Sequence, residues 1–126
     1  MDKDNKVVYI HRKSTDDTIF YVGIGKPSRA NSRRNRNSLW MNTVKKHGYY
    51  SEVLLEGLEW DDACEIETYL IGQLGRRDLR KGALVNQTNG GEGRPSREVQ
   101  YDDTPYHTKE QLRDMAALYH PRGNTI

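Results

Sequence analysis

The sequence predicts a fold of the broad α/β class, and more narrowly of the α+β type. A small central antiparallel sheet of three strands is expected to be flanked by helices, and a C-terminal helical extension is expected to follow this core. Two short runs of β-branched and aromatic residues lie close together near the N-terminus, and a third such run lies at residues 50–55. Apolar residues recur at helical spacing between and after these runs. The chain has 126 residues, which suits one domain of this kind.

The first two strands are expected at residues 7–10 and 19–22, because the turn-rich residues 14–17 between them favour an antiparallel hairpin. If Ile10 faces Phe20, Tyr9 lies directly opposite Tyr21. Side chains alternate along a strand, so the two faces of the hairpin differ in chemistry. The core face would hold Val8, Ile10, Phe20 and Val22, and the other face would hold Tyr9, His11, Tyr21 and Gly23.

Two helices are expected between the hairpin and the third strand. A proline suits the first turn of a short helix, which would carry Arg29 and Arg33 one turn apart. An Asn or a Ser can then cap a second helix, which a Gly ends and whose inner face holds a Trp and a Val. These marker residues are Pro27, then Asn37 or Ser38, Trp40, Val44 and Gly48.

The clearest helix in the chain begins at Asp61 or Asp62 as its N-cap and runs to about residue 74, just before Gly75. Residues 86–98 are loop-like, and after them Thr108 and Gln111 fit a capping box. The helix expected at residues 109–119 carries an apolar stripe of Leu112, Met115, Ala116 and Tyr119. We therefore divide the chain into a core at 1–93, a linker at 94–107, and a C-terminal helix and tail at 108–126.

The N-terminus and the cysteine content bear on the compartment. Cys64 is the only cysteine, which excludes an intramolecular disulfide and a cysteine-rich zinc module. Residues 1–6 are charged and polar, without the apolar segment of a signal peptide behind them. No run approaches the roughly 20 apolar residues that span a bilayer. We therefore expect a cytoplasmic protein with no membrane partner.

The net charge of +2 is unevenly distributed along the chain. No acidic residue occurs between Thr18 and Ser51, whereas residues 52–75 carry acidic side chains and neither Lys nor Arg. A basic cluster among polar residues is typical of nucleic-acid binding, although a solvated charged surface explains a charge run equally well. The basic residues closest together in the first stretch are Lys26, Arg29, Arg33, Arg34 and Arg36.

One carboxylate stands out on the helix that follows Asp62. With successive residues about 100° apart on a helical wheel, Glu67 falls inside the apolar sector, while Glu65 points the opposite way and is expected at the solvated surface. A carboxylate in an apolar sector needs a compensating partner. Glu67 either forms a buried ion pair with an arginine or binds a hard cation such as Mg²⁺ or Mn²⁺.

Several of these residues together resemble the motifs of the GIY-YIG nuclease family. Residues 7–9 (Val-Val-Tyr) stand where the family has its first tripeptide, and residues 21–23 (Tyr-Val-Gly) stand where it has the second. Arg29 follows on the expected short helix, Glu67 heads Glu-Thr-Tyr-Leu-Ile, and Asn86 matches the late asparagine of the family. The Gly-Gly-Glu-Gly run at residues 90–93 is similar to phage and homing-type members. The resemblance covers residues 6–93.

The resemblance implies an endonuclease that hydrolyses DNA with one divalent ion, Mg²⁺ or Mn²⁺, and leaves 5′-phosphate and 3′-hydroxyl ends. Tyr9 would activate or orient the attacking water, and Tyr21 would bind the water or the phosphate. Arg29 would grip phosphate through its planar fork, and Glu67 would hold the metal. Asn86 would position Tyr9, Glu67 or the backbone near them. The setting would be a bacterial or phage-infected cell. The side chains expected to bind substrate are Lys26, Arg33, Arg34, Arg36 and His11.

The sequence departs from the family pattern at two positions. Val7 replaces the glycine of the first tripeptide, and Arg33 stands where many members carry a histidine one helical turn after the arginine. Arg34 is the match to the family's arginine if the short helix is registered differently. The change at Arg33 keeps open an alternative function, a catalytically inactive nucleic-acid-binding module on the same scaffold. A homodimer could read a short DNA site symmetrically.

Overall fold

The structure is a computed structural model that describes residues 5–88 and 108–119, with side chains described as far as residue 114. Its strands are β1 (Lys6–Arg12), β2 (Ile19–Gly25) and β3 (Tyr50–Leu58), which form one antiparallel sheet in the order β2-β1-β3. Its helices are the 3-10 turns η1 (Pro27–Asn31) and η2 (Arg77–Leu79) and the α-helices α1 (Ser38–His47), α2 (Trp60–Leu74) and α3 (Lys109–Tyr119). The predicted α+β class, with a three-stranded antiparallel sheet, is confirmed.

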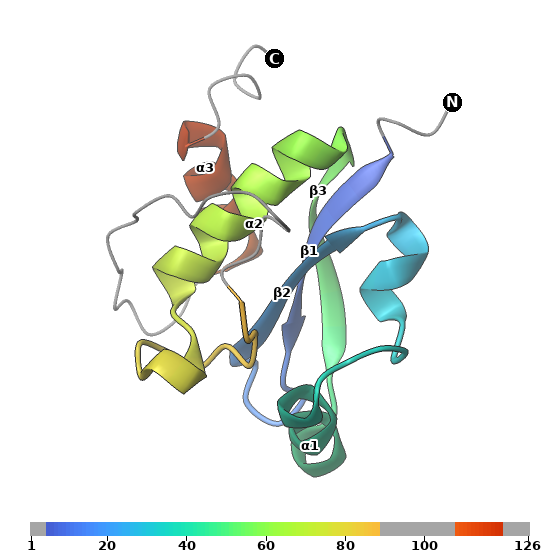
Figure 1. Cartoon of the computed structure of the whole chain (residues 1–126), viewed down its shortest axis with the longest axis vertical. Coiled ribbons are helices and arrows are strands. Elements are labelled where there is room, and N and C mark those ends of the chain that lie inside the picture. Colours follow the sequence, from blue (N-terminus) through green and yellow to red (C-terminus); the bar gives the residue numbers. More distant parts are fainter. Residues whose placement is uncertain (1–4, 89–107, 120–126) are drawn as a thin grey trace.

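The helices lie on both sides of the sheet (Figure 1). Helices α2 and α3 lie on one side, η1 lies on the other, and α1 lies near the hairpin end. The sheet side of α2 is apolar and packs on Val8, Ile10 and Val22, three of the four residues expected on the core face. Leu112 of α3 is fully buried in this same cluster, so α3 packs on the core through at least this residue.

The register of the hairpin differs from the expected one by two residues. Tyr9 pairs with Gly23 and His11 pairs with Tyr21, whereas we expected Tyr9 to lie directly opposite Tyr21. The turn closes through a hydrogen bond from the Lys13 N–H to the Thr18 carbonyl at 2.8 Å, which leaves four residues in the loop. A bulge at Phe20 then adds one residue to β2, so that the two tyrosines still share one face.

The bulge also changes the surroundings of Phe20. We expected this side chain on the face that α2 covers, but it packs in a second cluster with Trp40, Val44 and Val85. Ile19 takes its place in the cluster below α2. The expected burial of Phe20 is confirmed, and its expected neighbours are wrong because a bulge reverses the alternation of side chains locally.

The ends of most helices follow local capping. The Asn37 side chain accepts a hydrogen bond from the Trp40 N–H at 2.8 Å, and Gly48 and Gly75 end α1 and α2 with positive φ angles. The capping box that begins α3 is confirmed, because Thr108 and Gln111 exchange hydrogen bonds of 2.8 and 3.1 Å.

Several element boundaries differ from expectation, since β1 and β2 extend beyond the expected 7–10 and 19–22 and three other elements change as well. Helix α2 begins at Trp60 with Glu59 as its N-cap, so that Asp61 and Asp62 lie in the first turn, where they complement the helix dipole. Strand β3 continues to residue 58 rather than 55. The 3-10 turn η1 ends at residue 31, so Arg33 lies beyond the helix on which we expected it.

Among the described residues, no helix combines the length and apolar character needed to cross a bilayer. Three expected features lie outside the described residues. They are the linker at 94–107, the Gly-Gly-Glu-Gly run at 90–93, and the side chains of Met115, Ala116 and Tyr119 in the apolar stripe.

Gly23 is constrained by the tyrosine that faces it. A Cβ atom at this position would overlap the ring and hydroxyl of Tyr9, which lies across the glycine. Tyr9 is only 1% exposed, so its ring has no open space into which it can move. The glycine of the second tripeptide is therefore required by packing across the hairpin.

We expect Gly23→Ala to lower the free energy of unfolding by roughly 1–3 kcal/mol, the usual cost of overpacking a core. In a Tyr9→Ala background the same change should be nearly neutral, because the ring is gone. Urea denaturation of the four proteins of this double-mutant cycle measures the coupling. An equal cost in both backgrounds would contradict the assignment of the strain to Tyr9.

Candidate functional site

The sheet face away from α2 carries a hydrogen bond between a phenol and a guanidinium. Arg36 donates from Nη1 to the Tyr9 hydroxyl at 3.0 Å. Tyr9 comes from the centre of the middle strand, while Arg36 comes from the loop between η1 and α1. Tyr21 lies next to this pair, with its ring centroid 6.4 Å from that of Tyr9.

Arg36 is held at this position from several directions. Its Nε donates to the Ser32 carbonyl at 2.9 Å, and its Nη2 donates to the Arg29 carbonyl at 2.8 Å. Its guanidinium carbon lies 5.1–5.7 Å from the ring centroids of Tyr9, Tyr21 and Trp40, within the range of cation–π interaction. Three of its five N–H groups are used in these bonds, which leaves two for another acceptor.

Arg29 organises the loop next to Arg36. Its Nη1 donates to the Arg34 carbonyl and to Ser32 Oγ, and its Nη2 donates to the Asn35 carbonyl at 3.3 Å. Arg29 and Arg36 are therefore neighbours, and Arg36 is the one that contacts the Tyr9 hydroxyl. The structure thus brings together three residues expected at the site, Tyr9, Tyr21 and Arg29, with Arg36, which we expected only to bind substrate.

The other basic residues of this segment are exposed. Lys26 precedes η1, and Arg33 and Arg34 follow it. The Arg33 guanidinium lies 5.2 Å from the ring centroid of Tyr49, whose hydroxyl donates to the Asn31 carbonyl at 3.0 Å. These side chains surround the site with positive charge from a stretch that contains no acidic residue.

The protonation of Tyr9 follows from its burial. Burial raises the pKa of the Tyr9 phenol above its usual value, and the charge and hydrogen bond of Arg36 oppose this effect without cancelling it. The phenol is therefore protonated at neutral pH. Its oxygen accepts from Arg36, and its own hydrogen can be donated. Tyr9 in this state is suited to orienting an oxygen atom rather than to removing a proton.

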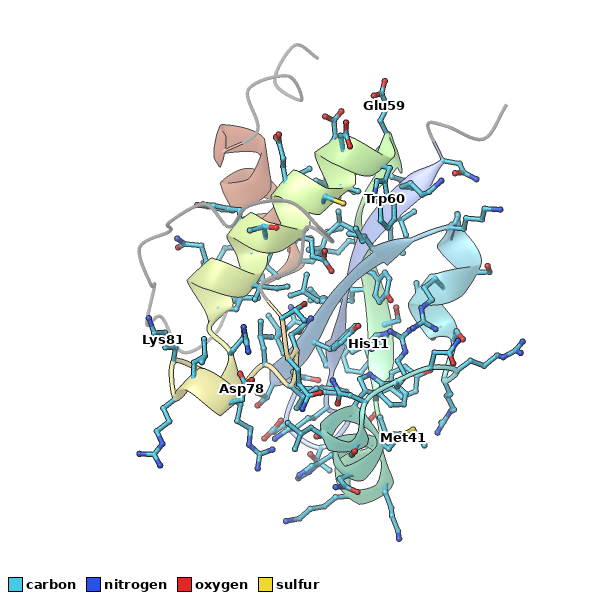
Figure 2. The ribbon with its side chains drawn as sticks, in the orientation of Figure 1. His11, Met41, Glu59, Trp60, Asp78 and Lys81 are labelled. Atoms are coloured by element: carbon cyan, nitrogen blue, oxygen red, sulfur yellow. The ribbon has the colours of Figure 1, made fainter. Side chains whose placement is uncertain are left out.

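His11 does not fit the expected role of binding substrate. It is fully buried among the aromatic side chains between the sheet and α1 (Figure 2). Trp40 Nε1, which can only donate, lies 3.0 Å from His11 Nδ1, and the Ala30 carbonyl, which can only accept, lies 2.7 Å from Nε2. These partners require the neutral tautomer with hydrogen on Nε2. Both ring nitrogens are thus engaged within the protein.

The burial of His11 lowers the pKa of its imidazole from 6.5 to about 4. The hydrogen bond to Ala30 opposes this shift, while the positive charges of Arg36 and Arg29 favour it. Protonation at Nδ1 would also break the bond from Trp40. His11 therefore positions Ala30 and Trp40 on either side of the tyrosines.

Asn86 binds the backbone of β2 rather than a tyrosine side chain. Its Oδ1 accepts from the Val22 N–H at 3.1 Å, and its Nδ2 donates to the Val22 carbonyl at 2.8 Å. Because β2 is an edge strand, this amide satisfies polar groups that have no partner strand. The expected positioning role agrees with this geometry, since Val22 lies directly after Tyr21.

Glu67 lies on α2, on the other side of the sheet from the tyrosines. It is half-buried, as we expected for a residue in the apolar sector, but Glu65 is half-buried too rather than solvated. Burial thus does not distinguish the two carboxylates, and α2 contacts α3 as well as the sheet.

Glu67 is also the residue expected to hold a metal ion. Within the described part of the chain, no group of three or more His, Cys, Asp or Glu side chains is arranged to hold such an ion. Mg²⁺ commonly binds proteins through one or two carboxylates, with water and substrate phosphates as its other ligands. A single glutamate fits that pattern, so the carboxylate of Glu67 suits a hard cation that is shared with substrate.

Sequence reasoning missed two contacts that shape the site. Arg12 is buried, with its Nε 2.8 Å from Glu52 Oε1 and its Nη1 3.0 Å from the Asp17 carbonyl, so it joins β1 to β3 and to the hairpin turn. The bond from Trp40 to His11 is the second. An arginine at the end of a strand and a tryptophan on a basic helix gave no local sign of these partners.

Comparison with models of known protein families, with curated proteins and with solved structures gives no match to this chain. The function of the chain is therefore argued from the geometry of the site and from the motifs in its sequence.

We expect Asn86→Ala to lower the free energy of unfolding by about 1–3 kcal/mol, because it leaves the Val22 N–H and carbonyl without their partners. Gln87→Ala, at the exposed neighbouring position, is the matched control and should change stability by less than about 0.5 kcal/mol. Urea denaturation measures both. Similar small effects of the two changes would contradict a structural role for Asn86.

The pKa of His11 predicts a dependence of stability on pH. The folded state binds fewer protons at this site than the unfolded state between the two pKa values, so stability falls as the pH is lowered from about 6.5 to about 4. The shift corresponds to roughly 3 kcal/mol. Asp16 and Asp78, whose pKa values are lowered below 3.8, affect stability at more acidic pH.

Urea denaturation at several pH values between 7.5 and 4, with His11→Gln as the control, tests this dependence. The variant should lose much of the slope because glutamine does not titrate. An NMR titration of the imidazole in the unchanged protein gives the pKa directly. A His11 pKa near 6.5 would contradict the burial argument.

Proposed function

We propose that the protein is a metal-dependent endonuclease of the GIY-YIG type, which hydrolyses DNA and leaves 5′-phosphate and 3′-hydroxyl ends. The observation that carries the proposal is the hydrogen bond from Arg36 to the Tyr9 hydroxyl beside Tyr21, surrounded by exposed basic side chains. A guanidinium next to two phenols in a positive field is suited to binding a phosphate oxygen and developing negative charge.

The order of the elements supports the GIY-YIG assignment. The two tyrosines lie on neighbouring strands, the arginine segment follows the second strand, Glu67 lies on the helix after the third strand, and Asn86 follows that helix. This is the order of the motifs in the resemblance on which the proposal draws.

Arg36 and Arg29 together would bind the scissile phosphate. The two guanidinium groups are held by backbone carbonyls of one loop, and each has N–H groups left for an incoming acceptor. Because these bonds exist before substrate arrives, less reorganisation is required on binding. Arg36 is proposed as the arginine closest to the reaction, since it touches Tyr9.

Tyr9 would act as a protonated phenol. Its raised pKa argues against a role as a strong base, and its hydroxyl hydrogen would be donated to the attacking water or to a phosphate oxygen. Tyr21, which is more exposed, would supply a second hydroxyl. The burial of Tyr9 keeps this donor in one orientation, which favours a defined geometry for attack.

Glu67 would hold one Mg²⁺ or Mn²⁺ ion, with water and the substrate phosphate completing its ligands. When bound, such an ion neutralises charge on the phosphate and on the leaving oxygen. Glu67 lies on α2, on the side of the sheet away from the tyrosines, so substrate would have to contact both sides of the sheet.

Incubation with supercoiled, linear duplex and single-stranded DNA in Mg²⁺ or Mn²⁺ tests the proposal, with the cleaved ends mapped. We expect cleavage that leaves 5′-phosphates and that Glu67→Ala abolishes. Arg36→Lys should reduce the rate roughly 10²–10³-fold, the usual effect of removing one donor to developing charge, because lysine cannot supply the planar fork. Glu65→Ala is the matched control on the same helix and should retain cleavage.

Two outcomes would revise the proposal. Salt-sensitive DNA binding without cleavage, unchanged in Glu67→Ala, would indicate the inactive nucleic-acid-binding module instead. A larger loss of rate in Arg29→Lys than in Arg36→Lys would return the catalytic role to Arg29. Circular dichroism of each variant separates loss of folding from loss of catalysis.

A further inference from the structure

A second basic surface lies outside the proposed cleavage site. A pocket of about 510 Å³ opens between α1, the hairpin turn and the loop that follows η2. Figure 2 marks the η2 side of this region by Asp78 and Lys81, across from α1. The residues that give the pocket its character are Lys13, Phe20, Thr43, Lys46, His47 and Arg77.

The cations of this pocket come from three separate elements. Lys13 directly follows β1, Lys46 lies in the last turn of α1, and Arg77 lies in η2. No acidic side chain lines the described pocket. Three positive charges that converge from different parts of the chain favour an anionic ligand.

The nearest acidic residues in the chain affect the two sides of the pocket differently. Asp78 binds Arg76 through two contacts of 2.9 and 2.7 Å rather than its neighbour Arg77. Asp16 accepts from the Thr18 N–H at 3.0 Å and also interacts electrostatically with Lys13 and His47, so it offsets part of the charge on the hairpin side. Lys46 and Arg77 form no ion pair among the described residues and keep the opposite part of the pocket positive.

The size of the pocket favours a nucleotide over a simple ion. Its volume falls in the usual range for small-molecule sites, roughly 300–1,000 Å³, and exceeds the needs of a single phosphate. Phe20 and Val85 at its base are buried, so the open part of the lining is mainly polar and basic. Lys46 of α1 and Arg77 of η2 could bind the phosphate of the nucleotide.

The pocket and the Tyr9–Arg36 pair lie on two sides of one aromatic cluster. Phe20, at the base of the pocket, directly precedes Tyr21 and has its ring centroid 6.1 Å from that of His11. Trp40 contacts both Phe20 and the Arg36 guanidinium. A strand of several nucleotides that crosses α1 could therefore occupy both surfaces.

We propose that this pocket binds one nucleotide unit of a nucleic-acid strand, with its phosphate between Lys46 and Arg77. The inference deepens the proposed nuclease function and rests on it for the identity of the ligand. The pocket would fix the path of the strand and so the position of cleavage relative to a bound phosphate.

Fluorescence anisotropy with a labelled single-stranded oligodeoxynucleotide, in EDTA to prevent cleavage, tests this binding. We expect Lys46→Gln to weaken binding roughly threefold to tenfold at low salt. The decrease of the logarithm of the association constant with the logarithm of the salt concentration should become less steep by about one. Arg77→Gln should behave similarly. Lys45→Gln is the matched control, because Lys45 lies on the same turn of α1 but does not line the pocket, and its effect should stay within about twofold.

NMR titrations with deoxyadenosine monophosphate and with inorganic phosphate distinguish a strand from a free ligand. If the pocket binds a strand, either small ligand should shift the amide resonances of the pocket only at high concentration. Lys46→Gln should then weaken the binding of the oligonucleotide. The contrary result is tight binding of the mononucleotide while Lys46→Gln leaves the affinity for the oligonucleotide unchanged. That result would overturn the proposal of a strand in favour of a free nucleotide. Equal effects of Lys45→Gln and Lys46→Gln would overturn the pocket itself.

Failure of this inference is separable from failure of the nuclease proposal. Cleavage that depends on Glu67, together with equal behaviour of the Lys45 and Lys46 variants, would reject the pocket alone. Loss of oligonucleotide binding in Lys46→Gln, without cleavage in any metal, would reject the nuclease and retain the pocket.

Discussion

The close approach of Tyr9 to Gly23 is the constraint on which the rest of the tyrosine face depends. With no Cβ on the opposing strand, the ring lies flat across the hairpin and its hydroxyl reaches the loop after η1. Arg36 binds this hydroxyl and also the carbonyls of residues 29 and 32, so one guanidinium fixes the loop to the sheet. A larger residue at position 23 would therefore disturb the loop as well as the hairpin.

Burial, reinforced by the same cations, keeps the histidine beneath them neutral. Arg36 and Arg29 favour an anion at the surface and oppose a proton on His11, which burial has already made difficult to charge. His11 instead uses both nitrogens to hold Ala30 of η1 and Trp40 of α1. Concentrating positive charge at this site thus requires a neutral, fully hydrogen-bonded group below it, which an imidazole with a lowered pKa provides.

Sequence reasoning succeeded where the determinants are local. The caps at Asn37 and Thr108 involve residues a few positions apart, so pattern alone predicted them. The hairpin register was wrong because the bulge at Phe20 depends on packing against Trp40, twenty residues later. The role of Arg36 was also missed, since a long side chain can reach many partners and only the fold selects Tyr9. A helical wheel similarly could not account for α3, which packs against α2.

The edge of β2 connects the two halves of the proposed site. Tyr21 and Glu67 belong to opposite sides of the sheet, and β2 is the edge strand on which α2 packs. An unpaired edge would invite another strand, but the Asn86 amide occupies the polar groups of Val22, and the Val85 N–H binds the Phe20 carbonyl at 2.7 Å. Pairing with a further strand is thereby blocked beside Tyr21. Asn86 can thus support the proposed cleavage without touching substrate, because it holds the backbone of β2 directly after Tyr21.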